Sequence, residues 1–159
     1  KILEVGSAIG YSALRMAAAN PDAEIHTIEI NHSAARYAVR VFERAGLSNR
    51  IHLIEGDANE VLPHLAAEGM TFDMIFVDAA KAQYMSFFEP CMNMLISGGL
   101  LVSDNVLYKG MTATDELVLH RKRTIVKRLR DYIDMLCTHP MLNTAVLPVG
   151  DGVALSVKK

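Results

Sequence analysis

The chain has 159 residues, 51% of them hydrophobic, and a formal net charge of −2. A chain of this length and composition can bury a sizeable core, so we expect one domain rather than several. The near-neutral charge excludes a protein that binds nucleic acid or a membrane through its overall charge, and an anionic partner would have to meet a local basic patch.

Short apolar runs alternate with helical patterns along the chain, which predicts successive βα units. The predicted parallel strands are residues 1–6, 24–30, 50–56, 72–78 and 100–105, and the predicted helices are residues 11–20, 33–45, 58–68, 82–96 and about 114–136. Two more strand-like runs within residues 144–157 flank Gly150-Asp151-Gly152, which is typical of a hairpin turn. These elements predict an α/β fold with a mostly parallel seven-stranded sheet, an antiparallel C-terminal hairpin and helices on both faces.

The cysteines and the apolar runs bear on the cellular location. Cys91 and Cys137 lie far apart in the sequence, which favours free thiols in a reducing compartment over a disulfide. No signal-peptide pattern is present, and the longest apolar runs are too short to cross a bilayer. We therefore predict a cytoplasmic protein without a membrane partner.

A glycine-containing turn, "EVGSAIG", follows the first predicted strand. Gly6 and Gly10 allow the backbone to turn tightly and to approach a ligand closely. Ala8 stands where a dinucleotide-binding fingerprint needs its second glycine, so the turn disfavours NAD. Tight packing of the strand on the next helix explains the two glycines about as well.

Acidic residues follow the second and third predicted strands, at the sheet edge where ligands bind in folds of this type. Glu29 is placed to accept hydrogen bonds from a ribose diol, and its alternative role is to cap the following helix. Asp57 is placed to face the edge of an adenine, with the backbone amide of Ala58 as a further contact. Asp57 is also a common type of helix N-cap.

The ends of the fourth and fifth predicted strands carry groups suited to a metal and to proton transfer. Asp78 and Lys81 occur in "DAAK", and Asp104 and Asn105 occur in "SDN". Two carboxylates and an amide oxygen are hard ligands that suit Mg²⁺, with coordination positions left for water and substrate. The alternative for Asp78 and Lys81 is a local ion pair at the start of a helix.

These motifs together resemble a known enzyme family over nearly the whole chain. "KILEVGSAIGYSALRMA", "DAAKAQY", "GGLLVSDNVLYKG" and "PVGDGVALSVK" are similar to the metal-dependent class I O-methyltransferases that use S-adenosylmethionine (SAM), the group that contains catechol and caffeoyl-CoA O-methyltransferases. The resemblance implies a Rossmann-like methyltransferase domain spanning residues 1–159. It implies that Lys81 is the catalytic base and that a divalent cation, usually Mg²⁺, is bound by Asp78, Asp104 and Asn105. The residues expected along the cofactor are Glu4, Gly6, Ser12, Glu29, Asp57, Ala58 and Asp78.

The acceptor of the methyl group is harder to predict. Within the family the chain resembles bacterial tRNA 5-hydroxyuridine methyltransferases most, so a wobble hydroxyuridine in tRNA is the favoured acceptor. The segment "HRKRTIVKRLR", residues 120–130, holds six basic residues and no acid, and it suits either phosphate contacts or a solvated helix face. Tyr108, in the loop after "SDN", is placed to stack on a base, and Tyr84 is placed to touch the ligand or to pack on the sheet.

Two other functions stay open at this point. A catechol-like diol or a caffeoyl-CoA-like molecule could chelate the same metal through neighbouring oxygens. A catalytically silent module that binds the cofactor or RNA is the alternative outside enzymes. The family resemblance also implies a homodimer and a helical segment before the first strand, and since the chain starts at Lys1 with a predicted strand, we expect that segment to be missing from this sequence.

Overall fold

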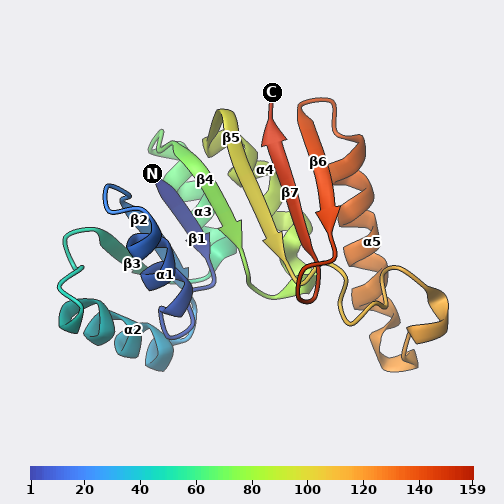
Figure 1. Cartoon of the computed structure of the whole chain (residues 1–159), viewed down its shortest axis with the longest axis horizontal. Helices are drawn as coiled ribbons and strands as arrows, with labels where there is room; N and C mark the ends of the chain where they lie inside the picture. The colour runs from blue at the N-terminus through green and yellow to red at the C-terminus, as the bar shows by residue number, and fades with distance from the viewer.

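The computed structural model describes all 159 residues, which form one twisted sheet flanked by helices (Figure 1). The strands are β1 (Ile2–Val5), β2 (Ile25–Glu29), β3 (Ile51–Glu55), β4 (Phe72–Val77), β5 (Leu95–Asp104), β6 (Leu142–Leu147) and β7 (Val153–Lys158). Their order in the sheet is β3-β2-β1-β4-β5-β7-β6. The first five strands pair in parallel, and β7 pairs antiparallel with both β5 and β6. The predicted mostly parallel sheet with an antiparallel C-terminal hairpin is confirmed.

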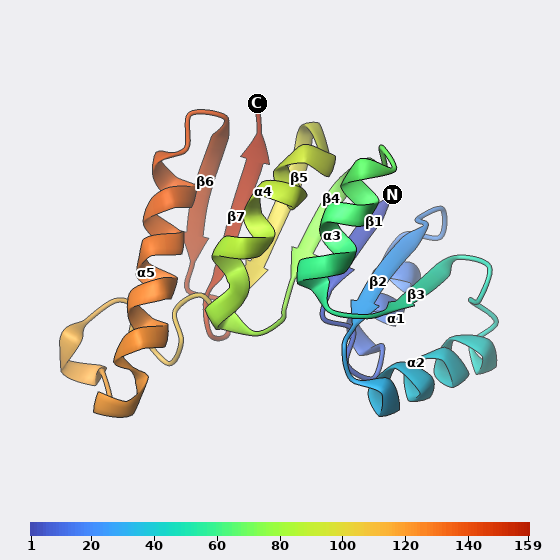
Figure 2. The same cartoon turned by 180° about the vertical axis from the view of Figure 1, so that it is seen from behind.

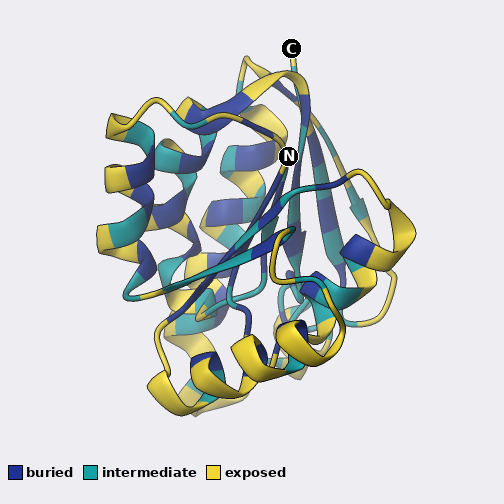
Figure 3. Ribbon diagram, turned by 90° about the vertical axis from the view of Figure 1, so that its left-hand side faces the viewer, coloured by how far each residue is buried: buried dark blue, intermediate teal, exposed yellow.

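Helices cover both faces of the sheet, as predicted. The helices α1 (Tyr11–Ala19) and α2 (His32–Arg44) lie on one face, and α3 (Ala58–Ala67), α4 (Tyr84–Met94) and α5 (Arg123–Thr138) lie on the other (Figures 1 and 2). Figure 3 shows that the buried residues of the helices face the sheet and that the exposed residues face away from it. The larger apolar cluster, under α3 to α5, includes Leu3, Ile75, Leu101 and Tyr132.

The predicted long helix of residues 114–136 is wrong at its start. Two short 3₁₀ turns, Asp115–Leu117 and His120–Lys122, replace its first residues, and α5 begins only at Arg123. The preceding segment packs on α5 through the Arg130 guanidinium. This group donates to the carbonyls of Met111 and Thr112 and forms an ion pair with Asp115 at 2.6 Å. These contacts hold residues 111–115 across the helix rather than in line with it.

The boundaries of α4 and β5 also differ from the prediction. A 3₁₀ turn, Lys81–Gln83, precedes α4, which ends at Met94 instead of residue 96. The strand β5 begins at Leu95, and its pairing with β4 shifts register between Phe72 and Met74. Gly98 and Gly99 therefore lie inside the irregular first half of a strand, where the sequence suggested the end of a helix.

Two sequence features concern the chain as a whole. Cys91 and Cys137 are both free, and Cys91 is buried whereas Cys137 is exposed. None of the helices combines the length and the apolar character that crossing a bilayer requires.

The strand register gathers the predicted functional residues at one edge. Val5 of β1 is level with Ile28 of β2 and with Val77 of β4, and Val77 is level with Ser103 of β5. The residues that follow these positions, including Gly6, Glu29, Asp78 and Asp104, consequently emerge side by side at the carboxyl ends of parallel strands. Ligands bind at this edge in open α/β sheets.

Candidate active site

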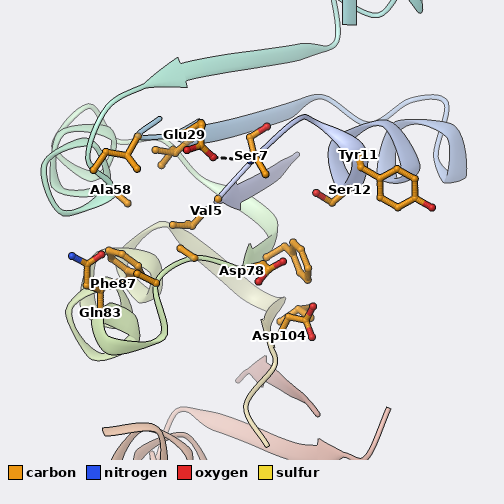
Figure 4. A pocket seen from close by; sticks show the side chains of 18 of the residues that line it. Val5, Ser7, Tyr11, Ser12, Glu29, Ala58, Asp78, Gln83, Phe87 and Asp104 are labelled. Carbon is orange, nitrogen blue, oxygen red and sulfur yellow. Dashed lines mark hydrogen bonds between the residues drawn. The ribbon is translucent and has the colours of Figure 1, made fainter. Parts of the chain in front are cut away.

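A cavity of about 770 Å³ opens at the carboxyl edge of the sheet. Its wall includes seven of the predicted site residues: Gly6, Ser12, Glu29, Asp57, Ala58, Asp78 and Asp104. Figure 4 shows that Glu29 and Ala58 lie on one side of the cavity and that Asp78 and Asp104 lie together on another. Of the other predicted residues, Glu4 lies beneath the wall, and Lys81 and Asn105 flank Asp78 and Asp104.

The turn after β1 has a backbone that only glycine fits well. Gly6 has a φ of +103°, and a Cβ there would lie 2.2 Å from the carbonyl oxygen of Asp78. Ala8 also has a positive φ, of 46°, and its amide donates to Glu29 Oε2 at 2.7 Å. The turn therefore packs directly on the backbone of "DAAK", and the carboxylate of Glu29 accepts the amide of Ala8 within the turn.

Glu29 organises the backbone around the cavity. Its side chain accepts the amide of Ala8 through Oε2 and the amide of Asn31 through Oε1, both at 2.7 Å. Each carboxylate oxygen keeps a further lone pair for a ligand. Glu29 therefore does not cap α2, because the Asn31 side chain does so by accepting from Ala34.

Glu4 is a fully buried acid under the wall of the cavity. The hydroxyls of Ser12 and Thr27 both donate to its carboxylate. Burial raises the pKa of Glu4 above its ordinary range, and the nearby charges of Asp78 and Glu29 act in the same direction, whereas the two hydroxyl donors oppose the shift. Ser12 thus lines the cavity and is also hydrogen-bonded to the buried Glu4 beneath it.

The wall formed by α3 and α4 combines predicted and unpredicted residues. Asp57 caps α3 by accepting the amide of Asn59 at 2.8 Å, and both Asp57 and Ala58 line the cavity. Gln83 and Phe87 line it as well, and Figure 4 places them on the same side as each other. Neither was predicted from the sequence, although they follow "DAAK" and lie four residues apart, which is one helical turn.

Lys81 forms an ion pair with Asp78 at the other side of the cavity. Its Nζ lies 2.9 Å from Asp78 Oδ1, and the lysine side chain is only 18% exposed. The local ion pair named as the alternative is therefore present in the structure. The same geometry keeps the amine beside the carboxylate of Asp78.

The ends of β4 and β5 offer a set of oxygen donors that fits a hard divalent cation. Asp78 and Asp104 follow residues that are level in the sheet, and both face the cavity. Asn105, in a left-handed conformation with a φ of 55°, adds a neighbouring amide, and its backbone donates to Asp104 Oδ1 at 2.6 Å. The three side chains offer oxygen ligands and neither a thiolate nor an imidazole, which suits a hard cation better than a soft one.

Comparison with known proteins identifies the family. A family model described as O-methyltransferase matches residues 1–159. The chain belongs to the O-methyltransferase family. Caffeoyl-CoA O-methyltransferase from Petroselinum crispum is 35% identical over 161 residues, which cover 96% of this chain and 66% of that enzyme. The chain thus spans slightly less than two thirds of this relative.

Solved structures of O-methyltransferases share the fold. A Staphylococcus aureus protein, provisionally named a caffeoyl-CoA O-methyltransferase, matches with a TM-score of 0.91 and 38% identity over 99% of this chain and 75% of its own. The O-methyltransferase from Bacillus cereus, in complex with SAH, matches with a TM-score of 0.88 and 27% identity over 99% of this chain and 73% of its own. The predicted Rossmann-like methyltransferase fold is confirmed.

The loop after Asn105 is held by the turn of the C-terminal hairpin. The amides of Leu107 and Lys109 donate to the backbone oxygen and the side chain of Asp151, in the turn of the C-terminal hairpin. Tyr108 does not line the cavity; it packs on the main core, and the Lys122 amine lies 5.7 Å from its ring centroid. The position predicted for base stacking is therefore covered by a lysine.

The basic segment of residues 120–130 is partly neutralised by ion pairs. Lys127 pairs with Asp131 at 2.8 Å, and Arg130 pairs with Asp115 at 2.6 Å. Arg121 and Arg123 are exposed and form no ion pair. The segment thus leaves part of its charge free for an anionic ligand.

Proposed function

We propose that the protein transfers a methyl group from SAM to a hydroxyl oxygen with the help of a bound divalent cation. The observation that carries this proposal is one continuous cavity. It runs from polar groups suited to a nucleoside, at Glu29 and Asp57, to the carboxylates of Asp78 and Asp104, with the Lys81 amine beside Asp78. A methyl donor and a hydroxyl acceptor need such an arrangement, because the two reacting atoms must meet in line and away from water.

The charge of the cavity supports SAM as the cofactor. Four acids line it, namely Glu29, Asp57, Asp78 and Asp104, against one base, Arg15, and Glu4 lies buried just beneath. The sulfonium of SAM carries a positive charge, which this surrounding negative field favours over a neutral analogue. The Bacillus cereus relative in complex with SAH, the product that SAM leaves after methyl transfer, supports the same assignment.

Each predicted cofactor residue except Asp78 is assigned in this proposal to a part of SAM. Glu29 would accept the ribose hydroxyls through the lone pairs that the turn amides leave free. Asp57 and Ala58 would meet the adenine, with Gln83 and Phe87 of α4 nearby. Gly6 lets the backbone approach the methionyl part closely, and Ser12 would meet its polar end while Glu4 holds the serine hydroxyl.

The divalent cation would be held by the oxygen atoms of Asp78, Asp104 and Asn105. Its chemistry would be to favour ionisation of an acceptor hydroxyl and to fix the orientation of that hydroxyl. The chain itself would supply two carboxylates, an amide oxygen and a nearby amine, and three protein ligands would leave coordination positions for water and the acceptor.

Lys81 is the proposed base for the acceptor hydroxyl. Its Nζ lies beside Asp78 and its side chain is largely shielded from water, so the nitrogen is held at the point where the acceptor oxygen must lose its proton. The ion pair with Asp78 positions the amine before the acceptor arrives.

A small molecule with two neighbouring hydroxyls is the proposed acceptor. The Petroselinum crispum and Staphylococcus aureus relatives carry names that refer to caffeoyl-CoA, and they support this acceptor over tRNA. A tRNA hydroxyuridine, which the sequence analysis favoured, is kept as the second candidate because Arg121 and Arg123 remain unpaired near the start of α5. Both acceptors carry phosphate groups when the small molecule is a CoA thioester.

A methyl-transfer assay tests the proposal directly. Labelled SAM is offered with caffeoyl-CoA, catechol, hydroxyuridine-containing tRNA and unmodified tRNA, each with Mg²⁺ or with a chelator. We expect label in the small diols only, in Mg²⁺ only, and little transfer by Asp104→Ala. Label in the hydroxyuridine tRNA alone would replace the acceptor. SAM binding without transfer to any acceptor would support a catalytically silent module instead.

The homodimer stays a prediction, which light scattering can check.

A further inference from the structure

Tyr84, the first residue of α4, connects the two strand ends that carry the proposed metal ligands. Its side chain is buried, with 1% exposure, and its hydroxyl lies 3.2 Å from the carbonyl oxygen of Val77 and 2.9 Å from that of Asp104. Val77 directly precedes Asp78. The two carbonyl oxygens share the single hydroxyl proton, with the shorter contact to Asp104, so one hydroxyl links the backbone on both sides of the gap between the carboxylates of Asp78 and Asp104.

The ring of Tyr84 also supports Lys81. The Lys81 Nζ lies 5.7 Å from the ring centroid and 2.9 Å from Asp78 Oδ1. The amine thus has an anion on one side and an aromatic face on another, and both attract a cation. Together these contacts limit the positions that the lysine side chain can reach.

Contacts on the far side of the ring fix Tyr84 itself. Tyr132 of α5 packs edge-on against it, with 5.4 Å between the ring centroids, and the Tyr132 hydroxyl is hydrogen-bonded to Ser103 at 2.8 Å. Ser103 directly precedes Asp104 in β5. The pair of tyrosines therefore forms one buried unit beneath the ends of β4 and β5.

We propose that Tyr84 is a positioning residue that sets the spacing of Asp78 and Asp104 and holds Lys81 beside them. Two carboxylates side by side repel each other, and the hydroxyl opposes this by tying together the backbones from which they project. The cavity does not include Tyr84 in its wall, so the residue acts through its neighbours and not by touching a ligand. The consequence for metal binding rests on the function proposed above, whereas the tie between the strand ends does not.

Tyr84→Phe is the test variant, because it keeps the ring and removes only the donor. Tyr132→Phe is the matched control, since it also deletes a buried tyrosine hydroxyl from the same unit but leaves the carbonyls of Val77 and Asp104 bound to Tyr84. Both variants are expected to unfold at somewhat lower temperature than the wild type. A purely structural role of Tyr84 predicts that the two variants behave alike in every other measurement.

The first measurement is amide hydrogen exchange, which needs neither metal nor activity. We expect faster exchange at Asp78 and Asn105 in Tyr84→Phe than in Tyr132→Phe, because these amides adjoin the carbonyls that lose their donor.

The second measurement is Mn²⁺ binding to the SAH-saturated protein, followed by electron paramagnetic resonance of free Mn²⁺. There we expect Tyr84→Phe to weaken binding and lower kcat on the order of 10- to 100-fold, the usual effect of losing a residue that orients metal ligands. SAH affinity should stay within about twofold of the wild type, because Tyr84 does not line the cavity.

The outcomes separate this inference from the function on which it rests. Equal exchange rates in the two variants at Asp78 and Asn105 would overturn the positioning role, whatever the wild type catalyses. Faster exchange in Tyr84→Phe with unchanged Mn²⁺ affinity and kcat would overturn its importance for the site. A wild-type protein that binds neither SAH nor Mn²⁺ would overturn the proposed function, while the exchange data would still decide the role of Tyr84.

Discussion

Gly6 and Asp78 are in such close contact that no side chain fits between them. A Cβ on Gly6 would lie 2.2 Å from the carbonyl oxygen of Asp78, and Gly6 has a φ of +103°. The turn proposed to meet SAM and the loop proposed to bind the metal therefore share one backbone contact. A backbone shift at Gly6 must therefore also displace the backbone at Asp78, and the reverse.

Gly6→Ala should for this reason impair both halves of the site. We expect loss of measurable SAH binding in calorimetry and a fall in the free energy of unfolding well above the ~1 kcal/mol of backbone strain alone. Gly46→Ala is the matched control, because Gly46 has a φ of +69° but its added Cβ would meet nothing within 4 Å. Equal stability losses in the two variants would show that the contact with Asp78 is unimportant.

Lys81→Ala should separate proton transfer from cofactor binding. We expect kcat to fall by about 10²- to 10⁴-fold, the usual contribution of a general base, with SAH affinity nearly unchanged because Lys81 lies outside the cavity wall. Lys127→Ala is the control: it removes an ion pair of similar length, 2.8 Å against 2.9 Å, at an exposed position of α5. Near-wild-type turnover by Lys81→Ala at neutral pH would rule out the base assignment.

The sequence predicted the sheet and its functional edge because both depend on local patterns. Apolar runs mark the strands, and polar residues such as Asp78 and Asp104 end up together because parallel strands bring their carboxyl ends to one edge. The start of α5 could not be predicted in this way. The basic segment there is compatible with a helix by itself, and only the distant contact of Arg130 with Asp115 shows why its first residues fold differently.

The roles of buried polar groups were equally hidden from the sequence. Tyr84 could pack on the sheet or touch a ligand, and only its distances to Val77 and Asp104 reveal the hydroxyl that joins two strands. The burial of Glu4 likewise depends on Ser12 and Thr27, which come from different elements. Such networks are set by tertiary packing, which residue spacing does not encode.

Asp151 should matter for the acceptor side of the site, since it holds the loop after Asn105. Its side chain accepts the amide of Lys109, and its carbonyl accepts that of Leu107 at 2.9 Å. Asp151→Ala removes the first of these bonds, so we expect a stability loss of about 1 kcal/mol and a KM for the acceptor raised by roughly the same free energy, without a change in SAH affinity. Steady-state kinetics with each substrate varied in turn measure the two KM values. Asp22→Ala, in the exposed turn after α1, is the control, and an unchanged acceptor KM in Asp151→Ala would mean that the loop does not contact the acceptor.

Glu4 should help the protein to distinguish SAM from its neutral product. Its buried carboxylate adds negative charge beneath the cavity proposed to hold the positively charged SAM, so Glu4→Gln is expected to lower the affinity for SAM by up to roughly tenfold and that for SAH much less. Because burial raises the pKa of Glu4, this carboxyl takes up its proton at a higher pH than an exposed glutamate does. The ratio of SAM to SAH affinity in the wild type should therefore fall as the pH is lowered from neutral, whereas the ratio in Glu4→Gln should change less. Calorimetric titrations of SAM and SAH between pH 5 and 8 give these ratios. Glu68→Gln, at an exposed position, is the control. Equal pH dependence in the wild type and in Glu4→Gln would exclude Glu4 as the source of the preference for SAM over SAH.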